Sequence, residues 1–428
     1  MIEITNVSAR EILDNRLEPT LRVTVETTAG QASADVPAGR SRGTNEAIEL
    51  RDGDERYRGL GVKQACTAIN DEIAPQFQGA DVTEQRRLDD RLLELDGTEN
   101  KSNLGGNTAT GVSLACLKAG ANATGLPLYR YVGGALSYVL PIPFFDMIEG
   151  GELAGGHLPF QEHQLVPVGA ESFSEGVRYA AEVYYELGTI LEAEYGEYSL
   201  NVGAEGGYTP IGIDDPRDAF DMLISAVEEL GYDRKFALAT DVAATHFYDP
   251  NSETYALLGE QFSRDDLIEL YNDLVESYPL ISLEDPLVET DFDGYAELTD
   301  RLDVQIIGDD FFVTDPDRVR RGIERGAANS LLMKVNQVGT VMEAVDAARV
   351  AQRNGYTVQV SERSGQTSDT WLADLTVGLD AGQIKTGVTR SERTEQYNRL
   401  LEIEDELGQM ATYGDPQTLS LFEGCTIG

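Results

Sequence analysis

Several residue types are scarce in this sequence of 428 residues. It has three cysteines, Cys66, Cys116 and Cys425, an odd number without metal-ligand spacing, which indicates free thiols in a reducing, cytoplasmic environment. Apolar runs of the ~20 residues that a membrane helix needs are missing. The first residues, Met1 to Ile4, carry neither a basic region nor an apolar signal core, so we expect no export.

Positive charge is also scarce. The chain has 33 lysines and arginines against 75 aspartates and glutamates, a formal net charge of −42, and only six of the basic residues are lysines. This charge repels nucleic acid and anionic membranes, so we expect neither as a partner. An acidic, lysine-poor surface is typical of adaptation to high salt, where screening weakens self-repulsion, and it therefore indicates a halophilic protein.

Three short apolar runs between Leu280 and Asn336 stand out because each ends in charged residues. The ends at Glu284, Asp309 and Lys334 lie 25 residues apart. This spacing fits one strand, one helix and two short loops. It therefore predicts consecutive strand–helix units.

The same period extends in both directions, to runs that end at Asp241, Glu362 and Lys385. With helical segments at 316–326 and 341–355, this many units predicts a parallel sheet closed into a barrel. The carboxyl ends of barrel strands converge on one face, where the active sites of such barrels lie. Helix caps would explain acids at these ends, but they do not explain the two lysines.

The first part of the chain has a different pattern. Residues 2–37 alternate as in three antiparallel strands, and residues 62–125 have helical spacing, so we expect an α+β domain over residues 1–134. Between them, the polar, glycine-spaced loop at 37–43 fits a mobile lid and a plain surface loop equally well. We expect the barrel domain, with the metal and catalytic residues, at 135–428.

Two further acids precede the regular period. We expect the first barrel strand at 138–145 and the next at 161–167, with Glu162 in its interior, where an unpaired carboxylate is expensive. The loop at 201–207 adds Glu205 between glycines. Both acids are therefore candidate site residues.

Several motifs resemble those of the enolase family. They are VPAGRSRGTNEAIELRDGD at 36–54, GLPLYRYVGG at 125–134, AEGG at 204–207, DVAATHFY at 241–248, LEDP at 283–286, LMKVNQVG at 332–339 and QIKTG at 383–387. They cover essentially the whole chain in the family's order. The resemblance implies a TIM-type (β/α)8 barrel of the enolase kind with an N-terminal α+β domain. It also implies Mg²⁺-dependent dehydration of 2-phosphoglycerate to phosphoenolpyruvate, commonly by a homodimer.

The resemblance also implies a role for each site residue. The first Mg²⁺ is expected at Asp241, Glu284 and Asp309, and a set of carboxylates suits a hard cation on independent grounds. Ser41 matches the serine that closes over a second Mg²⁺. Lys334 matches the base that removes the α-proton, and the acid that assists departure of the 3-hydroxyl is expected at Glu205, with Glu162 beside it. Gln161, Arg363, Ser364 and Lys385 match substrate-binding positions. We also expect Glu284 and Asp309 to face the substrate, together with Glu362, Arg40 and Arg42, which stand where the sequence departs from the family.

The sequence departs from the family's pattern mainly at its histidines. Glu362, Leu153 and Asn45 occupy positions where the family has histidine, and Ala204 stands where an acid precedes Glu205. A carboxylate at 362 near a trianionic substrate would feel a repulsion of roughly 1–4 kcal/mol per nearby charge. It must therefore pair with a cation or stay protonated.

Two interpretations of Glu362 follow. Either it is protonated and acts as a donor, with Arg40 and Arg42 supplying the lost phosphate charge, or the site is retuned for another phosphorylated or phosphonate acid. A catalytically silent, enolase-like binding protein is a third reading. Retention of Lys334 with all three metal carboxylates argues against silence.

The chain has only three histidines, His157, His163 and His246. We interpret each as an ordinary polar residue of a strand or loop. His157 alone is close enough in sequence to Leu153 to reach the same pocket.

Overall fold

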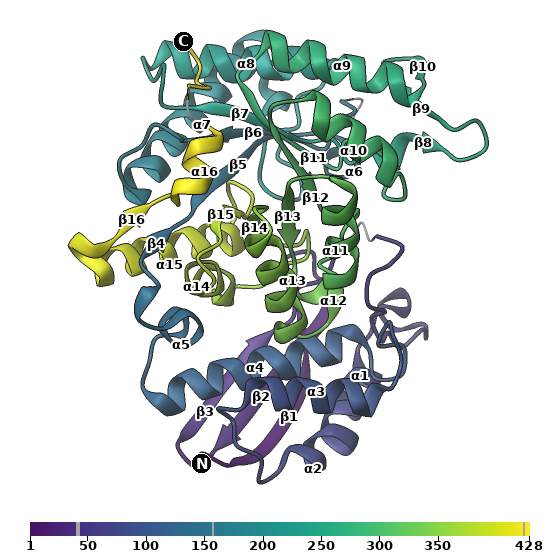
Figure 1. Cartoon of the computed structure of the whole chain (residues 1–428), viewed down its shortest axis with the longest axis vertical. Coiled ribbons are helices and arrows are strands. Elements are labelled where there is room, and N and C mark those ends of the chain that lie inside the picture. Colours follow the sequence, from purple (N-terminus) through teal and green to yellow (C-terminus); the bar gives the residue numbers. More distant parts are fainter. Residues whose placement is uncertain (40–42, 156–157, 423) are drawn as a thin grey trace.

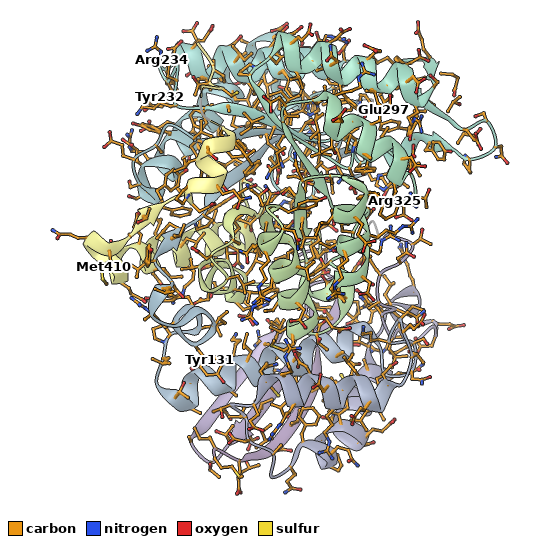
Figure 2. All side chains as sticks on the ribbon, viewed as in Figure 1. Tyr131, Tyr232, Arg234, Glu297, Arg325 and Met410 are labelled. Atoms are coloured by element: carbon orange, nitrogen blue, oxygen red, sulfur yellow. The ribbon has the colours of Figure 1, made fainter. Side chains whose placement is uncertain are left out.

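The structure, a computed structural model, describes residues 1–39, 43–155, 158–422 and 424–428. Figure 1 shows a smaller α+β part, formed by the N-terminal end of the chain, beside a larger barrel part. Figure 2 shows side chains filling the space within and between the two parts, and one apolar cluster includes Val23 and Leu104 of the first part together with Leu283 of the barrel.

Three strands begin the chain and pair antiparallel in sequence order, as the alternation predicted. They are β1 (Ile4–Leu13), β2 (Pro19–Thr27) and β3 (Gly30–Asp35). The helical region is also confirmed, as η1 (Arg56–Gly59), α1 (Lys63–Thr67), η2 (Ala68–Ile73), α2 (Ala74–Phe77), α3 (Gln85–Asp96) and α4 (Gly106–Thr124). Most residues of α4 are buried, because this helix packs on β2 and β3.

Eight strands close the predicted barrel in the order β11-β12-β13-β14-β15-β5-β6-β7. Their bounds are β5 (Ile142–Glu149), β6 (Glu162–Val166), β7 (Ala237–Asp241), β11 (Leu280–Glu284), β12 (Gln305–Gly308), β13 (Ser330–Met333), β14 (Thr357–Ser361) and β15 (Gly382–Lys385). All residues of these strands are buried, which explains their continuous apolar runs.

β6 differs from the expected parallel sheet. It runs antiparallel to both β5 and β7, whereas the other neighbouring strands of the barrel are parallel. A parallel return usually needs a crossover helix, and the described residues of this connection form one helix of a single turn, α6 (Gly151–Ala154). Glu162, expected inside the strand, is its first residue. Because β6 is reversed, this end lies at the same mouth as the carboxyl ends of the other strands.

The expected first barrel strand at 138–145 is two strands. β4 (Val139–Leu140) pairs with β16 (Thr412–Tyr413), and β5 begins only after Pro141. Proline has no N–H for a ladder hydrogen bond, which explains the break. The short helices α5 (Leu128–Gly133) and η3 (Gly134–Leu136) precede β4, and the domain division at residue 134 stays a prediction.

Helices follow most barrel strands, including the two expected at 316–326 and 341–355. They are α7 (Phe173–Tyr195), η4 (Glu197–Leu200), α8 (Pro216–Glu229), η5 (Ala244–Phe247), α9 (Arg264–Ser277), α10 (Phe292–Arg301), α11 (Pro316–Arg325), α12 (Val335–Val338), α13 (Val341–Arg353), α14 (Trp371–Gly378), α15 (Ser391–Leu407), η6 (Gly408–Met410) and α16 (Pro416–Leu421). A small antiparallel sheet of β8 (Tyr248–Asp249), β9 (Thr254–Leu257) and β10 (Glu260–Phe262) extends from the barrel at the right of Figure 1.

Local sequence signals set several of these helix ends. Asp315 accepts the backbone N–H groups of Asp317 and Arg318, and Pro316 follows it in the first turn of α11. Among the residues that the structure describes, no helix combines the length and the apolar character that a bilayer crossing requires.

Candidate active site

The charged strand ends meet at one mouth of the barrel. A cavity there is lined by Gly39, Leu153, Gln161, Glu162, Glu205, Asp241, Asp309, Lys334, Ser361, Glu362, Arg363, Ser364 and Lys385. The structure therefore brings most of the residues predicted from the sequence into one place. Arg40, Ser41 and Arg42 were predicted in the loop over this mouth, and they lie outside the described residues.

Three carboxylates, those of Glu162, Asp241 and Glu284, surround the ammonium of Lys385. The carboxylates lie within 4.8 Å of one another. Lys385 Nζ is 2.6 Å from Glu284 Oε2, 3.0 Å from Glu162 Oε2 and 3.4 Å from Asp241 Oδ2. Burial lowers the pKa of this lysine, but the surrounding carboxylates outweigh burial and raise the pKa well above its usual value. Lys385 therefore stays charged and balances part of the acid cluster.

Asp309 lies on the other side of this cluster and contacts the second lysine. Its carboxylate forms an ion pair with Lys334 Nζ and accepts a 2.7 Å hydrogen bond from Gln337 Nε2. Burial would raise the pKa of Asp309, but Lys334 and Lys385 outweigh it and lower the pKa. Asp309 is therefore held as an anion.

Sequence reasoning did not single out Asp285, which positions Asp309. The two carboxylate oxygens of Asp285 accept the backbone N–H groups of Asp309, at 2.9 Å, and of Asp310, at 2.7 Å. Burial and the charge of Asp309 raise the pKa of Asp285 to about 8. Asp285 directly follows the charged end of β11, and this position in the sequence could have identified it as a site residue.

The donor set fits a cation that prefers oxygen. Asp285, Asp309 and Asp310 form a second acid group within 4.8 Å. Glu284 Oε1 and Gln161 Oε1 are buried at the mouth with no hydrogen-bond partner among the described residues, which is costly unless another group takes these acceptors. Carboxylate and amide oxygens are the ligands that Mg²⁺ prefers, so this mouth has acidic groups that can hold the ion.

Lys334 directly follows β13 and lines the mouth, with 12% of its side chain exposed. Burial lowers its pKa, but the carboxylate of Asp309 outweighs burial and leaves the pKa raised. The direct ionic partner of Lys334 among the described residues is therefore the carboxylate of Asp309.

Glu205 lies across the mouth among further acids. Its carboxylate is within 4.8 Å of those of Asp146 and Glu162. Burial and the charge of Glu205 raise the pKa of Asp146 to about 6, and burial and Asp146 raise the pKa of Glu162 well above its usual value. Since closely spaced carboxylates cannot all ionise at neutral pH, this group retains protons.

Glu362 is paired with a buried arginine that the sequence argument missed. Its Oε2 contacts Arg393 Nη1 and accepts a 2.9 Å hydrogen bond from Thr386 Oγ1. Burial raises the pKa of Glu362 well above its usual value, although Arg393 acts in the opposite direction. Arg393 supplies the cation that the charge argument required. It lies on the buried stripe of α15 with Tyr397 and Leu400, and an arginine on an apolar stripe is a signal that the sequence contained.

Described residues on either side of 40–42 contact the barrel. Ala38 N donates to Gly365 O at 2.8 Å. Arg363 and Glu46 form a buried double ion pair, with Nη1 3.0 Å from Oε2 and Nη2 3.1 Å from Oε1. The guanidinium predicted to bind substrate is therefore held by a carboxylate from the N-terminal part of the chain.

The two histidines that the structure describes, His163 and His246, are absent from the lining of this cavity. His163 is buried between the rings of Phe160 and Phe220, and burial lowers its pKa to about 3, so it is a neutral core residue. His246 is exposed on η5. These two agree with the interpretation from sequence, while His157 lies outside the described residues.

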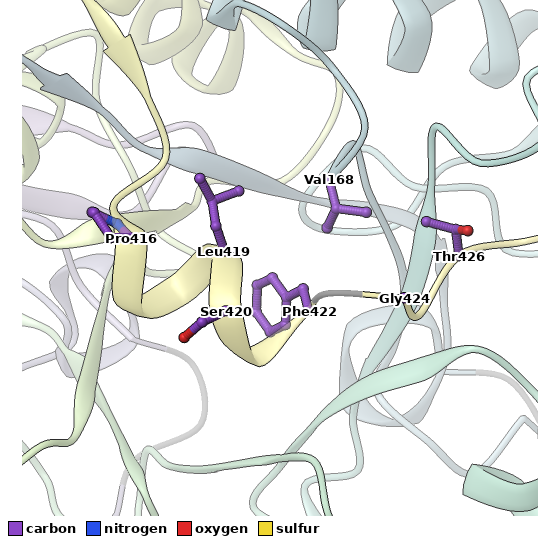
Figure 3. Close-up of a pocket in the computed structure, with 7 residues that line it drawn as sticks. All are labelled: Val168, Pro416, Leu419, Ser420, Phe422, Gly424 and Thr426. Atoms are coloured by element: carbon purple, nitrogen blue, oxygen red, sulfur yellow. The ribbon is translucent and has the colours of Figure 1, made fainter.

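A second hollow lies at the opposite end of the barrel, at the chain's C-terminal segment (Figure 3). Its volume is about 420 Å³, and it is lined by Val168, Pro416, Leu419, Ser420, Phe422, Gly424 and Thr426. Phe422 also packs on Ile142 and Phe144 at the start of β5. The described residues of this lining carry no carboxylate, imidazole, amine or thiol, in contrast to the described residues of the acidic mouth.

Comparison with known proteins matches both parts of the chain to one family. A family model described as the enolase C-terminal TIM barrel domain matches residues 137–420, and one described as the enolase N-terminal domain matches residues 4–132. A Methanopyrus kandleri protein named enolase is 53% identical over 420 residues, which cover 97% of this chain and 98% of that protein. Enolases of Thermococcus kodakarensis, 51% identical over 96% of both chains, and Pyrococcus furiosus, 50% identical over 98% of this chain and 99% of that protein, are similar to the same extent.

Proposed function

Because the chain belongs to the enolase family, we propose that its acidic mouth dehydrates 2-phosphoglycerate to phosphoenolpyruvate. The protein is a hydro-lyase of the phosphopyruvate hydratase kind. The observation that carries the proposal is the arrangement of the mouth, with a buried lysine beside Asp309 on one side and Glu205 among proton-retaining acids on the other.

The two sides have complementary tasks in this reaction. Lys334 Nζ, once deprotonated, takes the proton from the α-carbon of the substrate, and the electrons of that bond form the new double bond. Glu205, with Glu162 beside it, donates a proton to the departing 3-hydroxyl, which leaves as water. Glu162, whose pKa burial and Asp146 raise well above its usual value, lies within 4.8 Å of Glu205, which supports a proton-donating role for this pair.

Asp241, Glu284 and Asp309 are the residues that would hold the first Mg²⁺. Ser41, outside the described residues, would contribute to a second site. Bound Mg²⁺ supplies the positive charge that stabilises a carbanion next to a carboxylate. Lys385 keeps its charge and limits the repulsion between Glu284 and Glu162.

Substrate binding is assigned to the cations and polar groups around this centre. Arg363 has the planar guanidinium that suits phosphate, and substrate must compete with Glu46 for it. The other proposed substrate-binding residues are Gln161, Glu284, Asp309, Glu362, Ser364, Lys385, Arg40 and Arg42. Of these, Arg40 and Arg42 lie outside the described residues and are assigned because their charge could replace that of the missing histidines.

We also propose a cytoplasmic homodimer adapted to high salt. The net charge of −42 and the scarcity of lysine support the adaptation to salt, and three unpaired cysteines support a reducing compartment. Size-exclusion chromatography with light scattering, at low and at molar salt, tests the dimer and its salt dependence together.

The direct test of the reaction is an absorbance assay for phosphoenolpyruvate with 2-phosphoglycerate and Mg²⁺ in molar salt. We expect turnover that disappears when a chelator removes the metal and returns when Mg²⁺ is restored. A protein that is folded and inert toward 2-phosphoglycerate would favour a related phosphorylated or phosphonate acid as substrate. Leu153 and Glu362 in the lining of the cavity are the observation behind that alternative.

A further inference from the structure

The loop that carries Glu205 is folded around the side chain of Glu149. Glu149 is the last residue of β5, and its exposed fraction is 1%. Its Oε1 accepts the backbone N–H of Glu205 at 3.1 Å and that of Gly207 at 2.6 Å, and its Oε2 lies 3.2 Å from the N–H of Glu205. One carboxyl group therefore receives two neighbouring N–H groups of this loop.

The backbone of the loop is shaped to receive that group. Gly203 N donates to Gly207 O at 2.9 Å, which closes the loop on itself. Gly206 has a φ of +95°, a left-handed conformation that turns successive N–H groups toward one side, as in backbone anion nests. A Cβ on Gly203 would lie 2.2 Å from Glu149 Oε2, so the loop and the carboxyl are in close contact.

The same loop is held from the other side as well. Val388 N donates to Glu205 O at 3.1 Å, and Arg393 Nη2 donates to Ala204 O at 3.3 Å. Glu149 is not part of the cavity lining, whereas Glu205 is. The hydrogen bonds that the Glu149 carboxyl accepts therefore connect it to the cavity through the loop of Glu205.

We propose that Glu149 is a positioning residue for the elimination step, which holds Glu205 in place by accepting the N–H groups of its loop. The proposal rests on the function proposed above, with Lys334 as the base and Glu205 as the acid. It separates the two halves of the reaction. Removal of the α-proton depends on the Lys334 side of the mouth, and loss of water depends on the loop that Glu149 holds.

Two measurements on the same enzyme test this separation. Exchange of the α-proton of 2-phosphoglycerate in deuterated water reports the base, and phosphoenolpyruvate formation reports the complete elimination. In Glu149→Ala we expect product formation to fall by about 100-fold, the size of effect that a ~1 Å displacement of a catalytic group produces. Proton exchange should stay within about threefold of wild type, because the base keeps all its contacts.

The conservative variant separates hydrogen bonding from other effects. In Glu149→Gln the amide oxygen can accept both N–H groups that Oε1 accepts, so we expect both rates within about fivefold of wild type. If Glu149→Ala does not fold, Glu149→Asp takes its place. Its carboxyl is one methylene shorter and cannot reach both N–H groups, so it should show the same selective loss of product formation.

Asp96 provides a matched control in the α+β part. It is a buried carboxylate whose Oδ2 accepts the N–H groups of Asn103, at 3.1 Å, and Leu104, at 2.7 Å. Asp96→Ala removes the same kind of contact far from the barrel mouth. We expect it to lower thermal stability while the ratio of exchange to product formation remains that of wild type.

Each other outcome decides against the proposal. Equal losses of exchange and product formation in Glu149→Ala would make Glu149 a structural residue, and unchanged rates would make its contacts irrelevant to the reaction. Selective loss in Glu149→Gln as large as in Glu149→Ala would also overturn it. Failure of the proposed function looks different, because wild type would then show neither exchange nor product.

Discussion

The two sides of the barrel mouth differ in how their buried charged groups are compensated. On the base side, Lys334 is matched by Asp309, and Lys385 is matched by the carboxylates around it. On the acid side, five carboxyl groups come together: Asp146, Glu149, Glu162, Glu205 and Glu362. Among the described residues, Arg393 forms an ion pair with Glu362 and Lys385 forms one with Glu162.

The difference lies in where protons are kept. Ion pairing lowers the pKa of Asp309, whereas burial raises the pKa of Asp146 to about 6 and that of Glu149 to about 8. The side proposed to accept a proton thus has balanced charge. The side proposed to donate one holds acids in a space too apolar and too crowded for all of them to ionise.

The largest effect should come from breaking the base side. Lys334→Ala should lower both α-proton exchange and phosphoenolpyruvate formation by about 10²–10⁴-fold, because the general base is lost. NMR of 2-phosphoglycerate in deuterated water measures the exchange. Lys101→Ala is the control, since that buried lysine has a carboxylate partner, Glu343, at 2.6 Å outside the mouth. Exchange that survives in Lys334→Ala would move the base elsewhere, with Lys385 the next candidate.

Removing the partner of the only ion pair described for Glu362 should strongly lower the stability of the folded protein. Arg393→Leu removes one member of a fully buried pair and should lower the free energy of unfolding by about 3–5 kcal/mol. Chemical denaturation measures the loss. The double variant Arg393→Leu with Glu362→Leu should recover part of it, because no buried carboxylate is then left without its cation. A double variant as unstable as the sum of the two single ones would show that the pair is not coupled.

The metal assignment is tested at Asp309. Asp309→Asn should weaken Mg²⁺ binding by more than ~10-fold, because the amide lacks the charge that draws the cation. Calorimetric titration of metal-free protein measures the affinity. Asp374→Asn, a buried aspartate that pairs with Arg399 at 2.9 Å, should bind Mg²⁺ as wild type does. Equal affinity in wild type and Asp309→Asn would remove Asp309 from the metal site.

The smallest expected effect on activity comes from changing the charge of Glu362 on the acid side. The raised pKa of Glu362 means that it is protonated below that pKa and charged above it. Activity on 2-phosphoglycerate should therefore fall as pH rises through this pKa. Glu362→Gln should keep activity within about tenfold of wild type and lose that pH dependence, since a neutral hydrogen-bonding group remains.

The alternative substrate makes the opposite prediction at the same position. If the site is retuned, wild type should be nearly inert toward 2-phosphoglycerate at every pH. Glu362→His combined with Leu153→His should then raise that activity. Full wild-type activity that is insensitive to every change at Glu362 would contradict both interpretations.

Local pattern alone was enough to predict the barrel and the face that carries the chemistry. The 25-residue period, with charged residues at Glu284, Asp309 and Lys334, indicates a repeated unit of one strand and one helix. Each unit forms from contacts between residues that are close in sequence. The acids and lysines of the mouth were found for the same reason. The sequence pattern indicates where a strand ends, although it does not indicate which residues lie next to that end in space.

Only the tertiary structure decided which charges meet. The reversal of β6 brings Glu162 to the mouth, and the partner of Glu362 comes from a helix that begins 29 residues later. Glu149 meets the loop of Glu205 across 56 residues of chain. The sequence by itself determined the types of residue and the ends of the elements that carry them, because those signals are local. Charge pairing and the retention of protons depend on distance and burial, which exist only after the strands have closed the barrel.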